Sequence, residues 1–217
     1  MTRKRVEDAS AYLPESPSLK SLRVAAQSCQ ACDLYRNATQ AVLGAGPVSA
    51  KLVLIGEQPG NDEDVRGLPF VGPAGKLLDR ALADVGIDRS EVYLTNVVKH
   101  FKFEERGKRR IHKKPNSAEV EACHPWLEAE ILLIKPKMIV CLGATAAQSI
   151  LGRTYRLTKE HGTFHQHPWA ACVTAIIHPS AILRVPDADG RHRQYEEFVA
   201  DLKHIKNKLQ ECARTPG

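Results

Sequence analysis

Hydrophobic and polar positions divide the chain into two kinds of segment. Short apolar runs of strand length, rich in Val, Ile and Leu, are separated by longer segments with apolar residues at helical spacing. The predicted strands are Lys51–Glu57, Val92–His100, Met138–Gly143 and Val173–His178. The predicted helices are Leu19–Ala26, Gly75–Val85, Asn116–Ile134, Ala144–Leu151 and Arg193–Glu211. The polar residues 1–20 predict an N-terminal arm that leads into the first helix.

This alternation of strands and helices predicts the fold class. It is typical of α/β proteins, in which helices cover both faces of a parallel sheet. We therefore expect one domain over residues 1–217, a three-layer α/β/α sandwich around a mainly parallel four-stranded sheet. Ligands of such sheets bind beyond the carboxyl ends of the strands. The loops that follow Ile55, Asn96, Gly143 and Ile177 leave the predicted strands at that end.

Composition and charge narrow the class of protein. Hydrophobic residues make up 43% of the 217 residues and charged residues 26%, which is ordinary for a globular protein. The sequence contains no apolar run long enough to span a membrane and no signal-peptide pattern at its start. We therefore expect a cytoplasmic protein, and disulfides are rare in that compartment. We also expect a monomer. The net charge of +6 is compatible with a polyanionic partner without requiring one.

Two glycine-rich motifs follow the first predicted strand. GEQPG at 56–60 places Glu57 directly after that strand, and no GK[ST] follows that would make it a phosphate loop. Taken alone, it fits a tight turn with a helix-capping acid. GLPFVGPAGKLL at 67–78 holds Phe70 in a Gly/Pro frame before a helix. Such a ring either stacks on a planar base or packs in the core.

A basic segment separates the second predicted strand from the next helix. Residues 99–114 contain eight Lys and Arg residues, and we expect residues 101–115 to form a loop. Its side chains either face solvent or contact phosphates. His112 ends the run and either binds a phosphate or acts as a nucleophile, which requires the neutral imidazole. Arg109 and Arg110 would favour the neutral form and Glu57 the charged form.

The order and spacing of these motifs resemble one known family. GEQPGNDEDVRGLPFVGPAGKLL, TNVVKH and HPSAILR are similar to motifs of the uracil-DNA glycosylase superfamily, closest to its family 4. KRRIH at Lys108–His112 resembles the insert of UdgX, an offshoot that cross-links to uracil-containing DNA. The resemblance runs from about Cys29 to Arg184, which is most of the chain.

The resemblance implies roles that suit cleavage of a glycosidic bond, in which the sugar gains positive charge and the departing uracil negative charge. Glu57 would stabilise the sugar cation, and His178 would donate to the uracil oxygen. Amides of Gln58 could contact the same oxygen. Asn96 would pair with the uracil edge and reject cytosine. Phe70 would stack on the base once it has left the helix.

The implied partner is uracil-containing DNA, with single strands accepted. Ser180–Arg184 would enter the gap left by the flipped base, with Leu183 as the apolar wedge and Arg184 on a phosphate. The basic insert would hold the DNA backbone. The DNA-binding residues predicted in this way are Lys108, Arg109, Arg110, Ser180, Leu183 and Arg184.

A 4Fe–4S cluster is also implied, because family 4 binds one through four cysteines. Cys29 and Cys32 form a CxxC pair, which alone could be redox-active, half of a metal site or accidental. With Cys123 they match three of the family's cysteines, and the fourth falls at His100, as in UdgX-like chains. Histidine can replace cysteine on iron, although a zinc Cys3His site would use the same ligands.

Three further cysteines remain outside this ligand set. Cys141 is a rival fourth ligand, but it stands within the apolar run MIVCLG, which favours a small core residue. Cys172 and Cys212 have no partner that the sequence identifies.

We therefore expect the protein to flip deoxyuridine, cleave its glycosidic bond and bond to the sugar C1′ through His112. One alternative is a turnover glycosylase in which water is the nucleophile and KRRIH only grips DNA. Another is a non-catalytic iron–sulfur protein that binds uracil-containing or single-stranded DNA. The combination of Glu57, Asn96 and His178 argues against the second, because binding alone needs no carboxylate beside the sugar.

Overall fold

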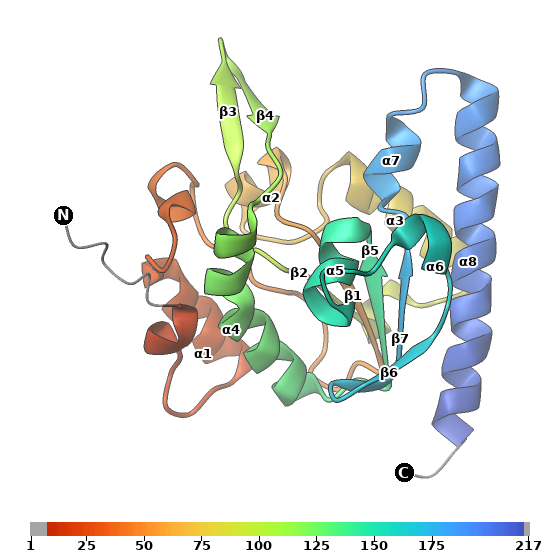
Figure 1. Ribbon diagram of the computed structural model, residues 1–217, viewed down its shortest axis with the longest axis horizontal. Coiled ribbons are helices and arrows are strands. Elements are labelled where there is room, and N and C mark those ends of the chain that lie inside the picture. The colour runs from red at the N-terminus through yellow and green to blue at the C-terminus, as the bar shows by residue number, and fades with distance from the viewer. Residues whose placement is uncertain (1–7, 215–217) are drawn as a thin grey trace.

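The computed structural model describes the backbone of residues 8–214 and the side chains as far as residue 212. Five strands form one mixed sheet in the order β2-β1-β5-β7-β6 (Figure 1). The four parallel strands are β1 (Leu52–Gly56), β2 (Val92–Asn96), β5 (Met138–Leu142) and β7 (Ala170–Ile176). At the edge, β6 (His165–His167) pairs antiparallel with β7. The predicted sheet had four strands and lacked β6. The three polar residues of β6 give no apolar run that would indicate a strand.

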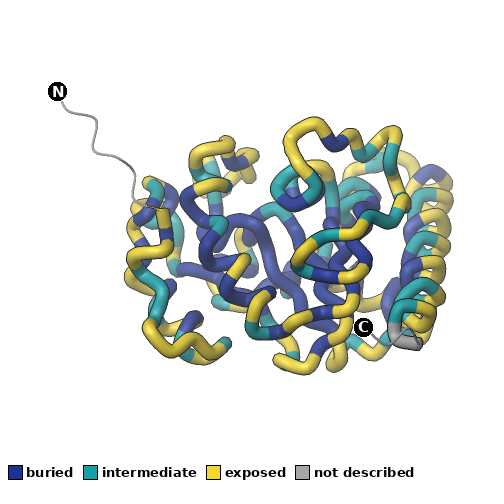
Figure 2. The backbone as a smooth tube through the Cα atoms, turned by 60° about the horizontal axis from the view of Figure 1, so that its bottom comes forward, coloured by how far each residue is buried: buried dark blue, intermediate teal, exposed yellow. Residues whose placement is uncertain are grey.

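Helices pack against both faces of the sheet, because successive strand residues point to opposite sides. In β1, Val53 and Ile55 join the apolar cluster under one set of helices, while Leu52 and Leu54 join the other. The first set is α1 (Leu19–Ala25), α4 (Ser117–Ile134) and α5 (Ala144–Leu151). The second is α3 (Pro73–Asp84) and α8 (Ala188–Arg214). Figure 2 shows the buried strands between these helices.

The predicted helices are present, and their ends follow ordinary capping rules. Asn116 caps α4 and forms a capping box with Glu119. Proline occupies the first turn of α3. A backbone N–H at that position would have no partner within the helix, so the helix loses no hydrogen bond. None of the helices within residues 8–214 is both long and apolar enough to cross a membrane.

Several short elements lie mostly in segments for which no helix was predicted. The short helices are α2 (Asn61–Arg66), α6 (Leu157–Glu160) and α7 (Pro179–Leu183). The 3-10 helices are Ala9–Tyr12, Ala26–Ser28, Asp33–Arg36 and Arg89–Glu91. The first seven residues of the predicted arm lie outside the described residues.

The basic segment after β2 forms a β-hairpin, so the prediction of a loop there was wrong. Its strands are β3 (Phe103–Arg106) and β4 (Arg109–His112), and Phe103 lies opposite His112. Charged side chains occupy most positions of both strands and hide the alternation that would signal them. The hairpin rises from the carboxyl end of the sheet, facing α7 across it (Figure 1).

A buried ion pair joins the end of β2 to α4. Lys99 Nζ lies 2.6 Å from Glu130 Oε2, and both side chains are fully buried. Nζ also donates to Thr95 Oγ1 at 2.8 Å and to the carbonyl of Asn96 at 2.7 Å. The second oxygen of Glu130 accepts from Tyr93 Oη and from the N–H of Gly44. Because both charges are excluded from water, each is stabilised by the other in place of solvent.

We predict that Glu130→Gln lowers the free energy of unfolding by about 3–5 kcal/mol, because it leaves the Lys99 charge buried without its partner. Denaturant unfolding followed by circular dichroism measures the change. Glu121→Gln is the matched control: Glu121 pairs with Arg153 at the surface, where the side chains are 64% and 76% exposed. Such a pair contributes about 0–1 kcal/mol. Equal losses in both variants would contradict the assignment.

Candidate active site

A cleft of about 750 Å³ opens at the carboxyl end of the sheet. Its wall combines the loops after β1, β2, β5 and β7 with one strand of the hairpin. The chemically active side chains that line it are Glu57, Asn96, His112, Thr145 and His178. The structure thus gathers Glu57, Asn96 and His178, which the sequence placed at the ends of separate strands, together with His112 and Thr145.

Asn96 and Phe70 meet at one end of this cleft, over Gly56. A Cβ at position 56 would overlap Asn96 Oδ1 and stand 2.8 Å from Phe70 Cζ, so only glycine lets both side chains approach. Phe70 adopts a left-handed backbone with φ of 57°, a strained conformation typical of functional sites. A Cβ at Gly75 would overlap the Phe70 carbonyl, so this second glycine permits the turn. The ring and the amide are therefore held rigidly.

The two carboxylate oxygens of Glu57 have different partners. Oε2 accepts a hydrogen bond from the Thr145 hydroxyl. Oε1 lies 3.4 Å from His112 Nε2. Thr145, at the start of α5, was missed by the sequence analysis because GATAA shows only a strand-to-helix junction. Its hydroxyl orients the carboxylate and leaves Oε1 facing the imidazole.

His112 is half-exposed at the end of β4, and its pKa lies below the usual range. Burial is the main cause, and Arg184 across the cleft lowers the pKa further, while Glu57 opposes both. The neutral form is therefore favoured at neutral pH. From the sequence, Arg109 and Arg110 were the cations expected to lower the pKa of His112. In the structure the cation that does so is Arg184, from the opposite wall.

His178 is the N-cap residue of α7, and one of its tautomers is favoured. The backbone N–H of Ser180 donates to Nδ1 at 3.1 Å, so Nδ1 must accept. Burial, Arg184 and His112 lower the pKa to about 4, which keeps the ring neutral at neutral pH. The remaining proton is then on Nε2, where it makes His178 a hydrogen-bond donor. Ser180, predicted to bind DNA, thus also orients this histidine.

The side chain of Gln58 joins the hairpin to the sheet. Its Nε2 donates to the carbonyls of Lys113 at 2.9 Å and Lys102 at 3.2 Å, and its Oε1 accepts from the Lys102 N–H at 3.0 Å. The side-chain amide is thus used to hold both ends of the hairpin. The uracil contact predicted for Gln58 therefore has no free side-chain amide N–H to draw on.

Arg110 holds the hairpin from its inner side. Its guanidinium lies over the rings of Phe103 and Phe101, 4.9 and 5.5 Å from the centroids. It pairs with the fully buried carboxylate of Asp64 at 2.7 Å and donates to Asn61 Oδ1. Strand alternation thus turns this side chain toward the protein, and its contact with DNA stays a prediction.

The other predicted DNA-binding residues lie in two places, at the tip of the hairpin and in the wall of the cleft. Lys108 and Arg109 are exposed at the tip of the hairpin. Leu183, which is 43% exposed, and Arg184 line the opposite wall beside α7. Leu183 and Arg184 therefore place an apolar side chain beside a cation in the wall of the cleft.

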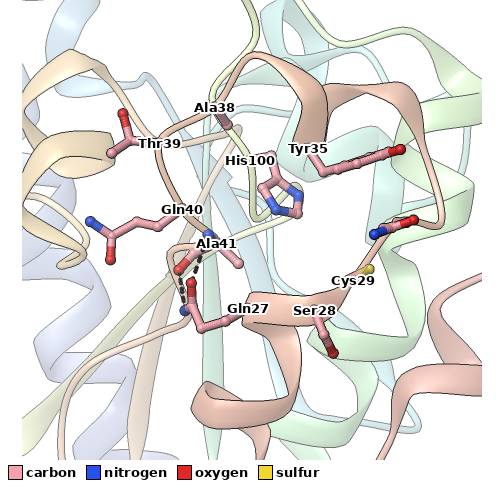
Figure 3. A pocket seen from close by; sticks show the side chains of 10 residues that line it. Gln27, Ser28, Cys29, Tyr35, Ala38, Thr39, Gln40, Ala41 and His100 are labelled. Carbon is pink, nitrogen blue, oxygen red and sulfur yellow. Dashed lines mark hydrogen bonds between the residues drawn. The ribbon is translucent and has the colours of Figure 1, made fainter.

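The predicted metal ligands lie on the other side of the hairpin base. A cavity of about 110 Å³ is lined by Cys29 and His100 together with polar side chains (Figure 3). Burial raises the pKa of Cys123 to about 12, and electrostatic interactions with Cys32 and Cys29 raise it further. Burial also lowers the pKa of His100 to about 4, which leaves a neutral imidazole able to bind a metal.

Two hydrogen bonds to sulfur strengthen the case for a metal centre. Trp126 Nε1 donates to Cys29 Sγ at 3.3 Å, and the Lys99 N–H donates to Cys123 Sγ at 3.2 Å. Such bonds stabilise thiolates that bind metals. Among residues 8–214, no three Cys, His, Asp or Glu side chains converge as the ligands of a single ion would. Cys141 is fully buried in the apolar core of β5.

Comparisons with known proteins agree with this arrangement. The model of the Uracil DNA glycosylase superfamily matches residues 43–203. The Type-4 uracil-DNA glycosylase of Archaeoglobus fulgidus is 38% identical over 185 residues, covering 82% of this chain and 86% of that protein. Those of Pyrobaculum aerophilum and Thermotoga maritima are 35% and 38% identical, covering 85% and 84% of this chain and 91% and 92% of those proteins. The chain therefore belongs to the uracil-DNA glycosylase superfamily.

Proposed function

We propose that this protein excises uracil from DNA and is then captured by the sugar through His112, as in UdgX. Excision is supported by the family and by the cleft. Capture is supported by one observation: the hairpin holds His112 Nε2 3.4 Å from Glu57 Oε1. In this role Glu57 faces the developing sugar cation, so a nucleophile beside it is also beside C1′.

Recognition of uracil follows from the two ends of the cleft. The base leaves the DNA stack and lies against Phe70, while the Asn96 amide pairs with its edge. The Nε2–H of His178 then donates to the uracil oxygen on which negative charge accumulates. A neutral imidazole suits this role, because it stabilises the leaving group without needing acidic pH.

Capture replaces the attack of water. The C1′–N1 bond breaks and its electron pair leaves with uracil. Glu57 then accepts the proton from Nε2 of His112, and the electron pair of that N–H bond forms the new bond from Nε2 to C1′. A positioned side chain outcompetes water because effective molarities reach about 10⁵–10⁸ M. The imidazole has no easy path of departure, so each molecule reacts once.

We predict that His112→Ser abolishes the covalent protein–DNA band formed with a uracil-containing oligonucleotide on a denaturing gel. The serine leaves room for water, so free abasic DNA should appear instead. His204→Ser is the control, because His204 is exposed on α8 and its ring contacts Phe164 at a tilt, outside the cleft. A band that persists without His112 would refute capture, and unchanged DNA with the wild-type protein would refute excision.

A second prediction separates anchoring from DNA contact in the hairpin. Arg110→Ala should reduce the rate of cross-linking more than 10-fold at every salt concentration, because it frees the strand that carries His112 from Asp64. Arg109→Ala removes the same charge from an exposed position. It should weaken DNA binding mainly through the salt dependence. Gel-based rate measurements at several salt concentrations give the comparison, and identical profiles would contradict an anchoring role.

The metal centre proposed here is a 4Fe–4S cluster held by Cys29, Cys32, Cys123 and His100. When bound, it would supply structural cross-links among the N-terminal segment, α4 and the turn after β2. The neutral His100, the small cavity and the N–H bonds to sulfur fit this group. The uracil cleft is built from other residues, so we assign the cluster no step in the reaction.

We predict that purified protein is brown and contains iron and acid-labile sulfide. Cys123→Ala should lose the brown absorbance and lower the melting temperature. Cys141→Ala is the matched control: it also removes a buried thiol, so it should destabilise the core while retaining the iron. Stoichiometric zinc without sulfide after anaerobic purification would contradict the cluster.

A further inference from the structure

Cys172 and Cys212 form a pair of thiols away from the cleft and the proposed cluster. Their sulfur atoms lie 2.7 Å apart, although the residues are 40 positions apart in the chain. Cys172 lies on β7 opposite Met138, the first residue of β5, and therefore at the amino end of the sheet. Cys212 lies near the end of α8. The site described above uses neither sulfur.

The other cysteines are placed for different roles. Cys29, Cys32 and Cys123 surround the proposed cluster, and Cys141 is fully buried in the core. Cys172 is 8% exposed, and Cys212 is more accessible. The pair therefore combines sulfur–sulfur contact with access for a small reagent through one member.

We propose that Cys172 and Cys212 are an oxidisable dithiol that closes to an intramolecular disulfide by exchange with a small disulfide. The Cys212 thiolate attacks the reagent, forms a mixed disulfide and releases one thiolate. The Cys172 sulfur then attacks the Cys212 sulfur and releases the second thiol of the reagent. Two protein thiols are oxidised and one small disulfide is reduced to two thiols, so the reaction balances and is reversible.

The order of attack follows from the surroundings of each sulfur. Burial and the hydrogen bond with Cys212 raise the pKa of Cys172 to about 11, so Cys172 is protonated at neutral pH. Only the thiolate is a good nucleophile. The more accessible Cys212 therefore meets the reagent first, and Cys172 acts second, at contact distance.

The disulfide would fasten the last turns of α8 to the sheet. Phe198, Leu202 and Ile205 are buried against the sheet, whereas Leu209 and Cys212 beyond them are only partly buried. The end of the helix therefore depends on weaker contacts. A bond to β7 closes a long loop in the unfolded chain and thereby stabilises the folded state.

The test treats the purified protein, with its metal centre, with glutathione disulfide and then blocks free thiols with N-ethylmaleimide. Peptide mass mapping without reductant should find the Cys172 and Cys212 peptides joined, with two hydrogens fewer than the sum of the free peptides. The melting temperature should rise by roughly 5–10 °C. Reductant should reverse both changes.

Cys212→Ser is the matched control, because it replaces a partly exposed sulfur by oxygen and should show no rise on the same treatment. The proposal is overturned if both thiols of the wild-type protein are alkylated, or if Cys212 retains glutathione while Cys172 is alkylated. Joining of two chains, seen as a dimer on a non-reducing gel, would equally overturn it. A linked peptide without a change in melting temperature would refute the proposal that the disulfide stabilises the end of α8 against the sheet.

Discussion

The buried pairing of Lys99 with Glu130 is the interaction on which the arrangement of the site depends. Enclosing two charges is unfavourable unless their remaining hydrogen-bonding groups are also paired, and here Tyr93, Thr95 and Gly44 complete the pairing. This requirement fixes β2, α4 and the N-terminal segment relative to one another. The carbonyl of Asn96 accepts from Lys99, and His100 follows Lys99 in the chain. The residue proposed to read uracil and the proposed cluster ligand are therefore positioned by one network.

The hairpin shows a second use of buried polar contacts. Its strands are short, charged and largely exposed, and a two-stranded hairpin of this kind is marginally stable alone. Gln58 binds the backbone at its base, and Arg110 joins its inner face to Asp64. The place of His112 beside Glu57 therefore depends on these anchors more than on apolar packing, and geometry that is set by directional bonds tolerates little slippage.

The sequence predicted the parts of the molecule whose residues carry a periodic apolar signal. The four parallel strands and the long helices belong to this class, and so does the meeting of side chains at the carboxyl end. The polar edge strand, the acidic α2 and the hairpin were not predicted, because their stability comes from contacts with distant segments. The same limit applies to Thr145, to Asp64 and to the Cys172–Cys212 contact. Each is defined by a partner that no local pattern indicates.

Under the proposed function, His112 must stay neutral while a polyanion covers it. Phosphates raise the pKa of a nearby imidazole, and Glu57 acts in the same direction. Two features oppose them: Arg184, which faces the imidazole from the other wall, and burial, which is already the largest cause of the lowered pKa. Bound DNA would close the cleft further, so burial would grow as the phosphates arrive. The same closure removes the water that competes for C1′. Exclusion of solvent thus favours both the reactive form of the histidine and its success over hydrolysis.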